Sequence, residues 1–148
     1  MRFSPFAWED GLDRQELTKR HDAGERDFRD VDLTGAKLSE VRLSGANMSR
    51  ANLSQSDLFG ANMRGAKLEG SDLSRADLTD ADLSWTNLNS ANLESAALDG
   101  ANLASAQCDE ATTWPEGFDV PDDMRFVSQG TTPQGASTAS PPASLPED

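Results

Sequence analysis

The sequence predicts an all-β solenoid, in which the chain winds into stacked four-sided coils around a narrow core. Three observations predict it. Large apolar residues recur every five positions, small residues stand two positions before them, and no residue is inserted or lost over seventeen repeats. This period fits neither a helix nor a strand, whose faces repeat about every 3.6 and every 2 residues. A bend after each pentapeptide would place one large and one small side chain inside every side of a square coil.

The repeat centres run without interruption from Phe28 to Cys108. Four pentapeptides make one turn, so the repeats predict about four coils, stacked at the roughly 4.8 Å spacing of paired strands. Such a solenoid shares one core between neighbouring coils. The predicted structural core is Leu33, Leu38, Leu43, Met48, Leu53, Leu58, Met63, Leu68, Leu73, Leu78, Leu83, Leu88, Leu93, Leu98, Leu103 and Cys108.

The tandem motif Ala-Asp/Asn-Leu-x-x, as in ADL at residues 76–78 and ANL at residues 91–93, resembles the pentapeptide-repeat proteins. The resemblance covers about residues 26–110, and the flanking segments GERDF and WPEGF are similar to those of bacterial members. It implies a right-handed quadrilateral β-helix, and the handedness rests on the resemblance alone. Because the repeat residues build the scaffold, function must be argued from a site on it.

Residues 1–25 are predicted to form an N-terminal extension and a short helix that caps the first coil. A solenoid needs such caps, since its ends otherwise expose core side chains and strand edges. Asp13 and Glu16 have the spacing of a capping box, with apolar residues at the staple positions, Leu12 and Leu17. Gly24 is placed to end the helix.

Residues 111–126 are predicted to cap the other end. Pro115 and Pro121 are expected to stop further ladder bonding, because proline has no N–H to donate. Three aromatic side chains are spaced to cover the core: Trp114, Phe118 and Phe126.

Residues 127–148 are rich in Ser, Thr, Pro and Gly and contain no aromatic residue, which predicts a disordered tail. At the other terminus the apolar start is short and is followed by Glu9 and Asp10, which predicts no signal peptide. No segment has the length of a membrane span. We therefore expect a cytoplasmic protein without a membrane partner.

The composition predicts no enzyme, no cofactor and no metal site. The single histidine, His21, and the single cysteine, Cys108, lie at opposite ends of the repeats and cannot share a proton. Cys108 stands at a repeat centre, which favours a small buried hydrophobe over a reactive thiol. Asp or Asn precedes nearly every centre, so these residues are expected to serve the turns rather than acid–base chemistry. Phosphate-binding glycine motifs are absent from the sequence.

The net charge of −13 is unevenly distributed along the chain. It is −2 for residues 1–30, +1 for residues 31–70, −7 for residues 71–110 and −5 for residues 111–148. The first half of the predicted rod is therefore nearly neutral, and the second half is acidic.

Two neighbouring sides of the predicted rod form a candidate protein-binding face. It consists of Asp57, Phe59, Asp77, Asp80, Asp82, Trp85 and Asp99. Phe59 and Trp85 are the aromatic residues at outward repeat positions, and aromatic side chains are favoured binding anchors. The alternative remains open that the charges only keep the rod soluble and that single exposed aromatics are ordinary.

Two function classes follow. The first is a non-enzymatic scaffold whose flat, partly acidic faces bind an unidentified protein partner, with a regulatory role as one form of it. The second comes from the subgroup of the family that mimics DNA, binds DNA gyrase or topoisomerase and protects it from quinolones or toxins. The half-acidic rod, the mostly leucine centres and the low repeat count disfavour the mimic. The sequence has no basic stripe, so we expect no direct nucleic-acid binding. It also has no motif that indicates a small-molecule substrate.

Overall fold

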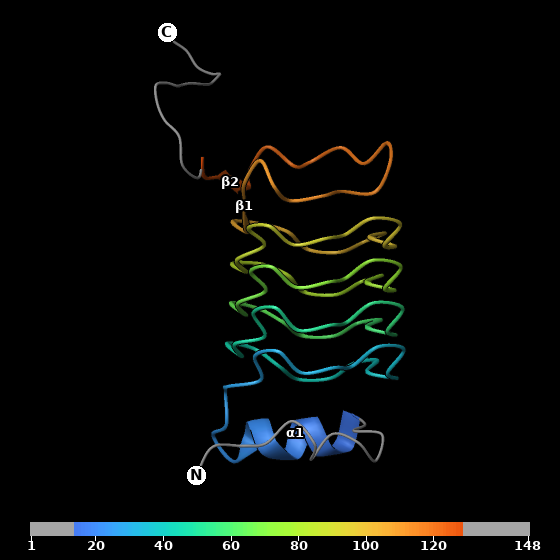
Figure 1. Cartoon of the computed structure of the whole chain (residues 1–148), viewed down its shortest axis with the longest axis vertical. Coiled ribbons are helices and arrows are strands. Elements are labelled where there is room, and N and C mark those ends of the chain that lie inside the picture. Colours follow the sequence, from blue (N-terminus) through green and yellow to red (C-terminus); the bar gives the residue numbers. More distant parts are fainter. Residues whose placement is uncertain (1–13, 129–148) are drawn as a thin grey trace, which may run out of the picture.

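The computed structural model describes residues 14–128 of the 148-residue chain. This part contains one helix, α1 (Arg14–Asp22), and two short strands, β1 (Gln107–Cys108) and β2 (Arg125–Phe126). Figure 1 shows a rod of stacked coils, with α1 lying across the end where the repeats begin and β1 and β2 near the opposite end. Single parallel bridges, rather than long strands, join the coils between these ends.

The coils follow a twenty-residue register. Parallel bridges join residues twenty positions apart without interruption, from the pair Asp27–Asn47 to the pair Asn87–Gln107. The bonds run in both directions across each side, because Asp57 accepts a bond from Leu38 (2.7 Å) and donates one to Ala36 (2.9 Å) through its backbone. The backbone polar groups of one coil are thus paired by the next, as a buried ladder requires.

A tight turn ends every pentapeptide. The Leu33 carbonyl accepts the N–H of Ala36 at 3.0 Å, and Gly35 between them has a φ of 68°. The equivalent residue of every repeat from Asp30 to Ser105 also has a positive φ, and ten of these residues are not glycine. This backbone region costs a non-glycine residue about 1 kcal/mol, so the fold imposes a small strain wherever a larger side chain occupies the corner.

Inward side chains fill the rod. All sixteen predicted centres are buried, with exposed fractions of 0–8%. Small residues lie two positions before them, and three of these carry a hydroxyl group. Ser56, Ser71 and Thr86 each donate that hydroxyl to the carbonyl of the preceding centre at 2.6–2.7 Å. A buried hydroxyl is acceptable here because the turn supplies its acceptor.

The register changes after Cys108. Asn92 bridges Thr113, twenty-one positions on, and β1 pairs in parallel with β2 through Gln107–Arg125 and Cys108–Phe126. The segment between them leaves the pentapeptide pattern. In this segment the rings of Trp114 and Phe118 stack with centroids 5.3 Å apart. Both rings and Met124 pack against the end of the core.

The expectation that the prolines stop ladder bonding is wrong. Beyond Pro121, the N–H groups of Arg125 and Val127 donate to the carbonyls of Ala106 and Cys108, both at 2.7 Å. Each proline removes only its own N–H. Pro121 begins the turn that brings the chain back onto the coil below, so its missing donor interrupts no ladder bond.

The expectation that Phe126 covers the core is also wrong. Phe126 is 65% exposed, although its neighbour in the fold, Cys108, is buried. Within residues 14–128, β2 is the last strand and no further coil packs on it. Met124 packs against the core instead.

α1 contacts the first coil through one apolar and one polar side chain. Leu17 is fully buried at the end of the core. His21 is also buried, and its Nε2–H donates to the Ser44 carbonyl at 2.6 Å. Together these contacts hold the helix across the end of the rod (Figure 1).

Gly24 ends the helix, with a φ of 100°. The N–H of Gly24 donates to the His21 carbonyl, and the N–H of Glu25 donates to the Arg20 carbonyl. This is the Schellman arrangement, which pairs the last carbonyls of a helix. Residues 1–13 of the predicted N-terminal extension, with Leu12 and Asp13, and residues 129–148 of the predicted tail lie outside the described residues. The predicted start of the tail at Val127 is wrong, because the Val127 N–H is bonded to the coil below.

Candidate protein-binding surface

The outward Asp and Asn residues before the centres hold the turns. Their Oδ1 accepts the backbone N–H two residues on, as Asp77 does from Thr79 at 3.0 Å. A serine or threonine in that position can donate its hydroxyl to the same oxygen, as Ser84 does to Asp82 at 2.6 Å. These are the side-chain turns that Asx residues favour. The prediction that the recurring Asp and Asn residues serve the turns is confirmed.

The structure distributes the seven candidate residues over two neighbouring sides. Asp57 and Asp77 are bridge partners in consecutive coils, which defines the Asp57 side. Asp82 bridges to residues 62 and 102, which defines the next side, the Asp82 side, and Trp85 stands at its far corner. The Asp57 side carries the five others: Asp57, Phe59, Asp77, Asp80 and Asp99.

The five carboxylates differ in how many of their oxygens already accept hydrogen bonds within the protein. Asp57, Asp77 and Asp82 each use one oxygen in their own turn. Within residues 14–128, Asp80 and Asp99 make no side-chain hydrogen bond or ion pair, and both are exposed. They adjoin, because the Asp80 N–H donates to the Asp99 carbonyl at 2.9 Å. The Asp80 carboxylate also occupies the space that a Cβ at residue 100 would need, so a side chain there would displace it.

Trp85 is the most unusual residue of the corners. Its side chain is 55% exposed and its backbone has a φ of 63°. The same corner carries Gly45, Gly65 and Ser105 in the other coils. A bulky residue in this backbone region is an outlier, and glycine would satisfy the turn without strain. The turn therefore does not require the indole.

The single cysteine and the single histidine are both buried in the fold. Cys108 is 3% exposed, and burial, with Asp109 as a smaller cause, raises the pKa of its thiol to about 11. It is therefore protonated at neutral pH. In the described part of the chain, no group of three His, Cys, Asp or Glu residues could hold a metal ion. No helix in the same part is long and apolar enough to cross a membrane.

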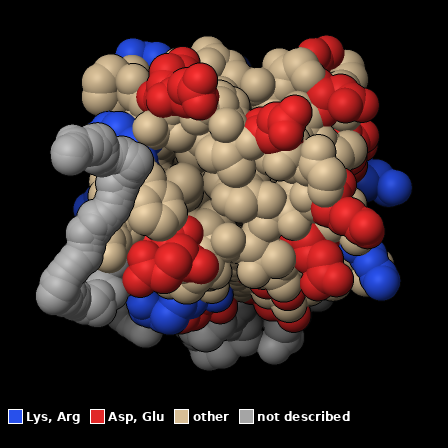
Figure 2. Space-filling model, turned by 90° about the horizontal axis from the view of Figure 1, so that it is seen from above, with Lys and Arg blue, Asp and Glu red and all other residues tan. Residues whose placement is uncertain are grey.

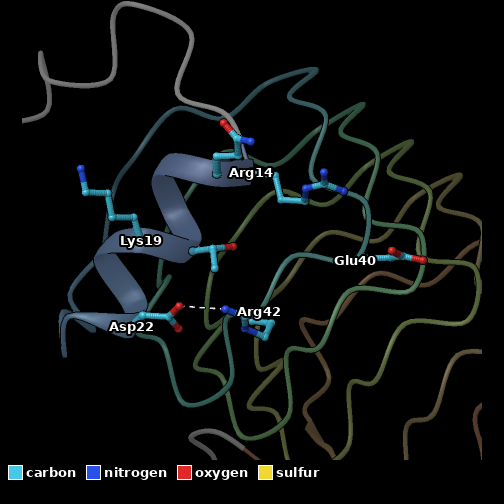
Figure 3. Close-up of a pocket in the computed structure, with 7 residues that line it drawn as sticks. Arg14, Lys19, Asp22, Glu40 and Arg42 are labelled. Carbon is cyan, nitrogen blue, oxygen red and sulfur yellow. Dashed lines mark hydrogen bonds and ion pairs between the residues drawn. The ribbon is translucent and has the colours of Figure 1, made fainter.

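The structure also forms a groove between α1 and the first coil (Figure 3). Its main section has a volume of about 610 Å³, and a second section has about 250 Å³. The repeat pattern does not predict this groove, because its walls come from segments outside and inside the repeats. Its charged lining residues are Arg14, Lys19, Asp22, Lys37, Glu40 and Arg42.

Acidic side chains gather at the C-terminal end of the rod. Figure 2 looks onto this end and shows Asp and Glu around its rim, with uncharged atoms in the middle. The exposed acidic residues of the last segment are Glu110, Glu116, Asp119, Asp122 and Asp123. The acidic surface thus continues from the last coils onto the end.

Fold and surface together define a class of protein, a parallel four-sided β-solenoid whose distinguishing residues point outward. A family model for pentapeptide repeats matches residues 27–65, 56–94 and 81–112, with eight copies of the repeat. The chain belongs to the pentapeptide-repeat family, as its sequence predicted. The search of curated proteins finds no match.

Solved structures agree on the family. The crystal structure of alr5209, a pentapeptide repeat protein from Nostoc PCC 7120, is 44% identical with a TM-score of 0.74, over 76% of this chain and 94% of that chain. Membership of this family implies that the present chain forms a right-handed quadrilateral β-helix. HetL from Nostoc sp. strain PCC 7120, involved in heterocyst differentiation regulation, is 28% identical with a TM-score of 0.36, over 66% of this chain and 53% of that chain.

A fluoroquinolone resistance protein is among the more distant structures. QnrB1, which is plasmid-mediated, is 17% identical with a TM-score of 0.19, over 68% of this chain and 80% of that chain. Similarity at this level, like that to HetL, supports no argument about the function of this chain.

Proposed function

We propose that the protein is a non-enzymatic interaction scaffold that presents its partly acidic Asp57 and Asp82 sides to a protein partner in the cytoplasm, with regulation as one form of that role. The proposal includes no cofactor and no nucleic-acid, membrane or small-molecule partner. α1 and residues 111–126 act in it as caps that shield the two ends of the core. The observation that carries the proposal is Trp85, an exposed indole at a corner where the fold favours glycine.

The surface around Trp85 supports this role. Tryptophan is enriched among the residues that dominate binding energy, and Phe59 adds a second exposed ring, 41% exposed. Asp80 and Asp99 supply carboxylates without a partner of their own in the described chain. Such charges would steer a basic partner and fix its orientation rather than supply most of the affinity.

Affinity capture followed by direct binding tests the proposal. Protein tagged at the C-terminus is incubated with lysate of the source organism, and each retained protein is then purified and titrated against wild type and variants. We expect Trp85→Ala to weaken the partner's binding at least about tenfold without lowering the melting temperature, since hot-spot truncations cost 2 kcal/mol or more. Val120→Ala, at an exposed apolar residue elsewhere, is the matched control. Equal binding by Trp85→Ala and Val120→Ala would remove Trp85 from the interface.

A second candidate function is a DNA mimic that occupies DNA gyrase or topoisomerase and protects it from quinolones or toxins. The net charge of −7 over residues 71–110 favours it, because a surface that attracts phosphates also attracts carboxylates. Enrichment of gyrase or topoisomerase subunits in the capture, followed by inhibition of supercoiling by the purified protein, would support the mimic over the scaffold.

A further inference from the structure

The lining of the groove between α1 and the first coil carries more positive than negative side chains, although the net charge of the whole chain is −13. Arg42 is neutralised by Asp22, with Nη2 and Oδ2 2.8 Å apart. The Arg14 guanidinium instead donates to an uncharged group, the Ser39 carbonyl, at 3.0 Å. Within residues 14–128, Lys19 and Lys37 make no ion pair. Among the described residues, three cations that line the groove therefore have no ionic partner: Arg14, Lys19 and Lys37.

The acidic residues of the lining do not cancel this charge. Asp22 is already paired with Arg42. Glu40 leans toward the next coil, since its Cγ lies 3.3 Å from the position that a Cβ on Gly60 would take. Figure 3 shows Glu40 pointing away from α1, whereas Arg14 reaches from α1 toward the first coil.

The groove is elongated. Its two sections share Arg14 and Gln15, so they adjoin along the start of α1. One section extends toward Lys19 and the other toward Lys37. The lining also contains polar side chains that can donate or accept hydrogen bonds: Gln15, Thr18 and Ser39. An extended chain fits two adjoining sections with cations in both better than a compact ligand does.

We propose that this groove is a second interaction surface, which binds an extended acidic peptide segment of a partner protein. Glu or Asp side chains of the segment pair with Arg14, Lys19 and Lys37, and its backbone bonds to the polar residues between them. One residue of the acidic sides lies close to the groove: Asp57 is the bridge partner of Lys37 in the next coil, and its Oδ1 already accepts the Phe59 N–H. The other carboxylates of these sides begin two coils away, roughly 10 Å at strand spacing, which exceeds the Debye length of about 8 Å at physiological ionic strength.

A fluorescein-labelled peptide of eight alternating Glu and Ser residues tests the assignment by fluorescence anisotropy. We expect the full chain to bind it at low salt and more weakly at physiological salt. The double variant Lys19→Glu, Lys37→Glu is expected to weaken binding at least about tenfold, which corresponds to 1.4 kcal/mol. The control double variant Lys67→Glu, Arg75→Glu makes the same change in net charge at exposed residues outside the groove, and we expect it to bind within about twofold of wild type.

Three outcomes would overturn the proposal. The first is equal weakening by both double variants, which would make the attraction one of net charge alone. The second is an absence of binding by folded wild type at low salt. The third is sedimentation of wild type as an oligomer that only Lys19→Glu, Lys37→Glu dissociates, because the occupant would then be the acidic end of another copy. Trp85→Ala should bind the peptide like wild type, so this test does not depend on the proposed acidic interface.

Discussion

The first two coils, residues 27–66, and the next two, residues 67–106, share one backbone and differ in their outer surface. Bridges, turns and buried centres repeat through both halves. Outside, the first half carries five basic and five acidic residues, whereas the second carries two basic and seven acidic. The difference shows that inward positions specify the solenoid, while outward positions are free to vary and can carry recognition.

The largest expected effect comes from placing a charge inside the acidic half. Leu78 is fully buried, so Leu78→Asp should unfold the middle coils, and Leu78→Ala should cost roughly 2 to 5 kcal/mol. Thermal melting followed by circular dichroism measures both. The control is Ser95→Asp, which adds the same charge at an exposed corner and should melt near wild type. Unchanged melting of Leu78→Asp would contradict the assignment of inward positions.

The turn residues sharpen the comparison, because they separate charge from hydrogen bonding. Asp77→Ala removes the acceptor for the Thr79 N–H and should cost about 1 kcal/mol. Asp77→Asn keeps an Oδ1 acceptor, as Asn52 and Asn62 show in the first half, and should melt like wild type. Chemical denaturation distinguishes the two. Equal loss by Ala and Asn would mean that the negative charge itself stabilises the coil.

What the sequence predicts well is what it repeats. The period, the buried centres and the turn role of Asp and Asn recur in many repeats, so a single exception does not change the prediction. Features that occur once were harder. Phe126 and Pro121 were misassigned because the segment after Cys108 has no register to extrapolate, and its path depends on single contacts such as the Trp114–Phe118 stack.

The candidate surfaces divide in the same way. The twenty-residue register places Asp57 beside Asp77, so their common side could be predicted. The register does not show that one carboxylate oxygen of each residue accepts a hydrogen bond in its own turn. The groove could not be predicted at all, because the angle at which α1 crosses the first coil follows from contacts such as His21 with Ser44 rather than from any repeat.

Replacing Trp85 is expected to have a smaller effect of opposite sign, which raises the stability of the fold and weakens partner binding. Trp85→Gly relieves the strain of a bulky residue at positive φ, so stability should stay equal or rise by up to about 1 kcal/mol. The same variant should lose partner binding as Trp85→Ala does. Urea unfolding measures the first effect and titration with the captured partner the second. A loss of more than about 1 kcal/mol would show that the indole stabilises the corner after all.

Acidification gives the smallest effect and returns the comparison to the nearly neutral half. The Thr34 hydroxyl, with the Thr34 N–H as a second cause, lowers the pKa of Asp32 below its ordinary value of 3.8. The native state thus favours the ionised carboxylate, and this contribution to stability is present above pH 3.8 and is lost as the pH falls through the lowered pKa. Asp32→Asn keeps an Oδ1 acceptor but cannot titrate, so it should melt like wild type at neutral pH and lose less stability at about pH 3.

Because Asp32 is exposed, solvent screening keeps the difference small, and parallel melts of the two proteins across the acid range are needed to resolve it. Identical acid profiles would mean that the Thr34 bonds do not favour the ionised form, and that the turn responds to an Oδ acceptor alone, as it does at the asparagine positions.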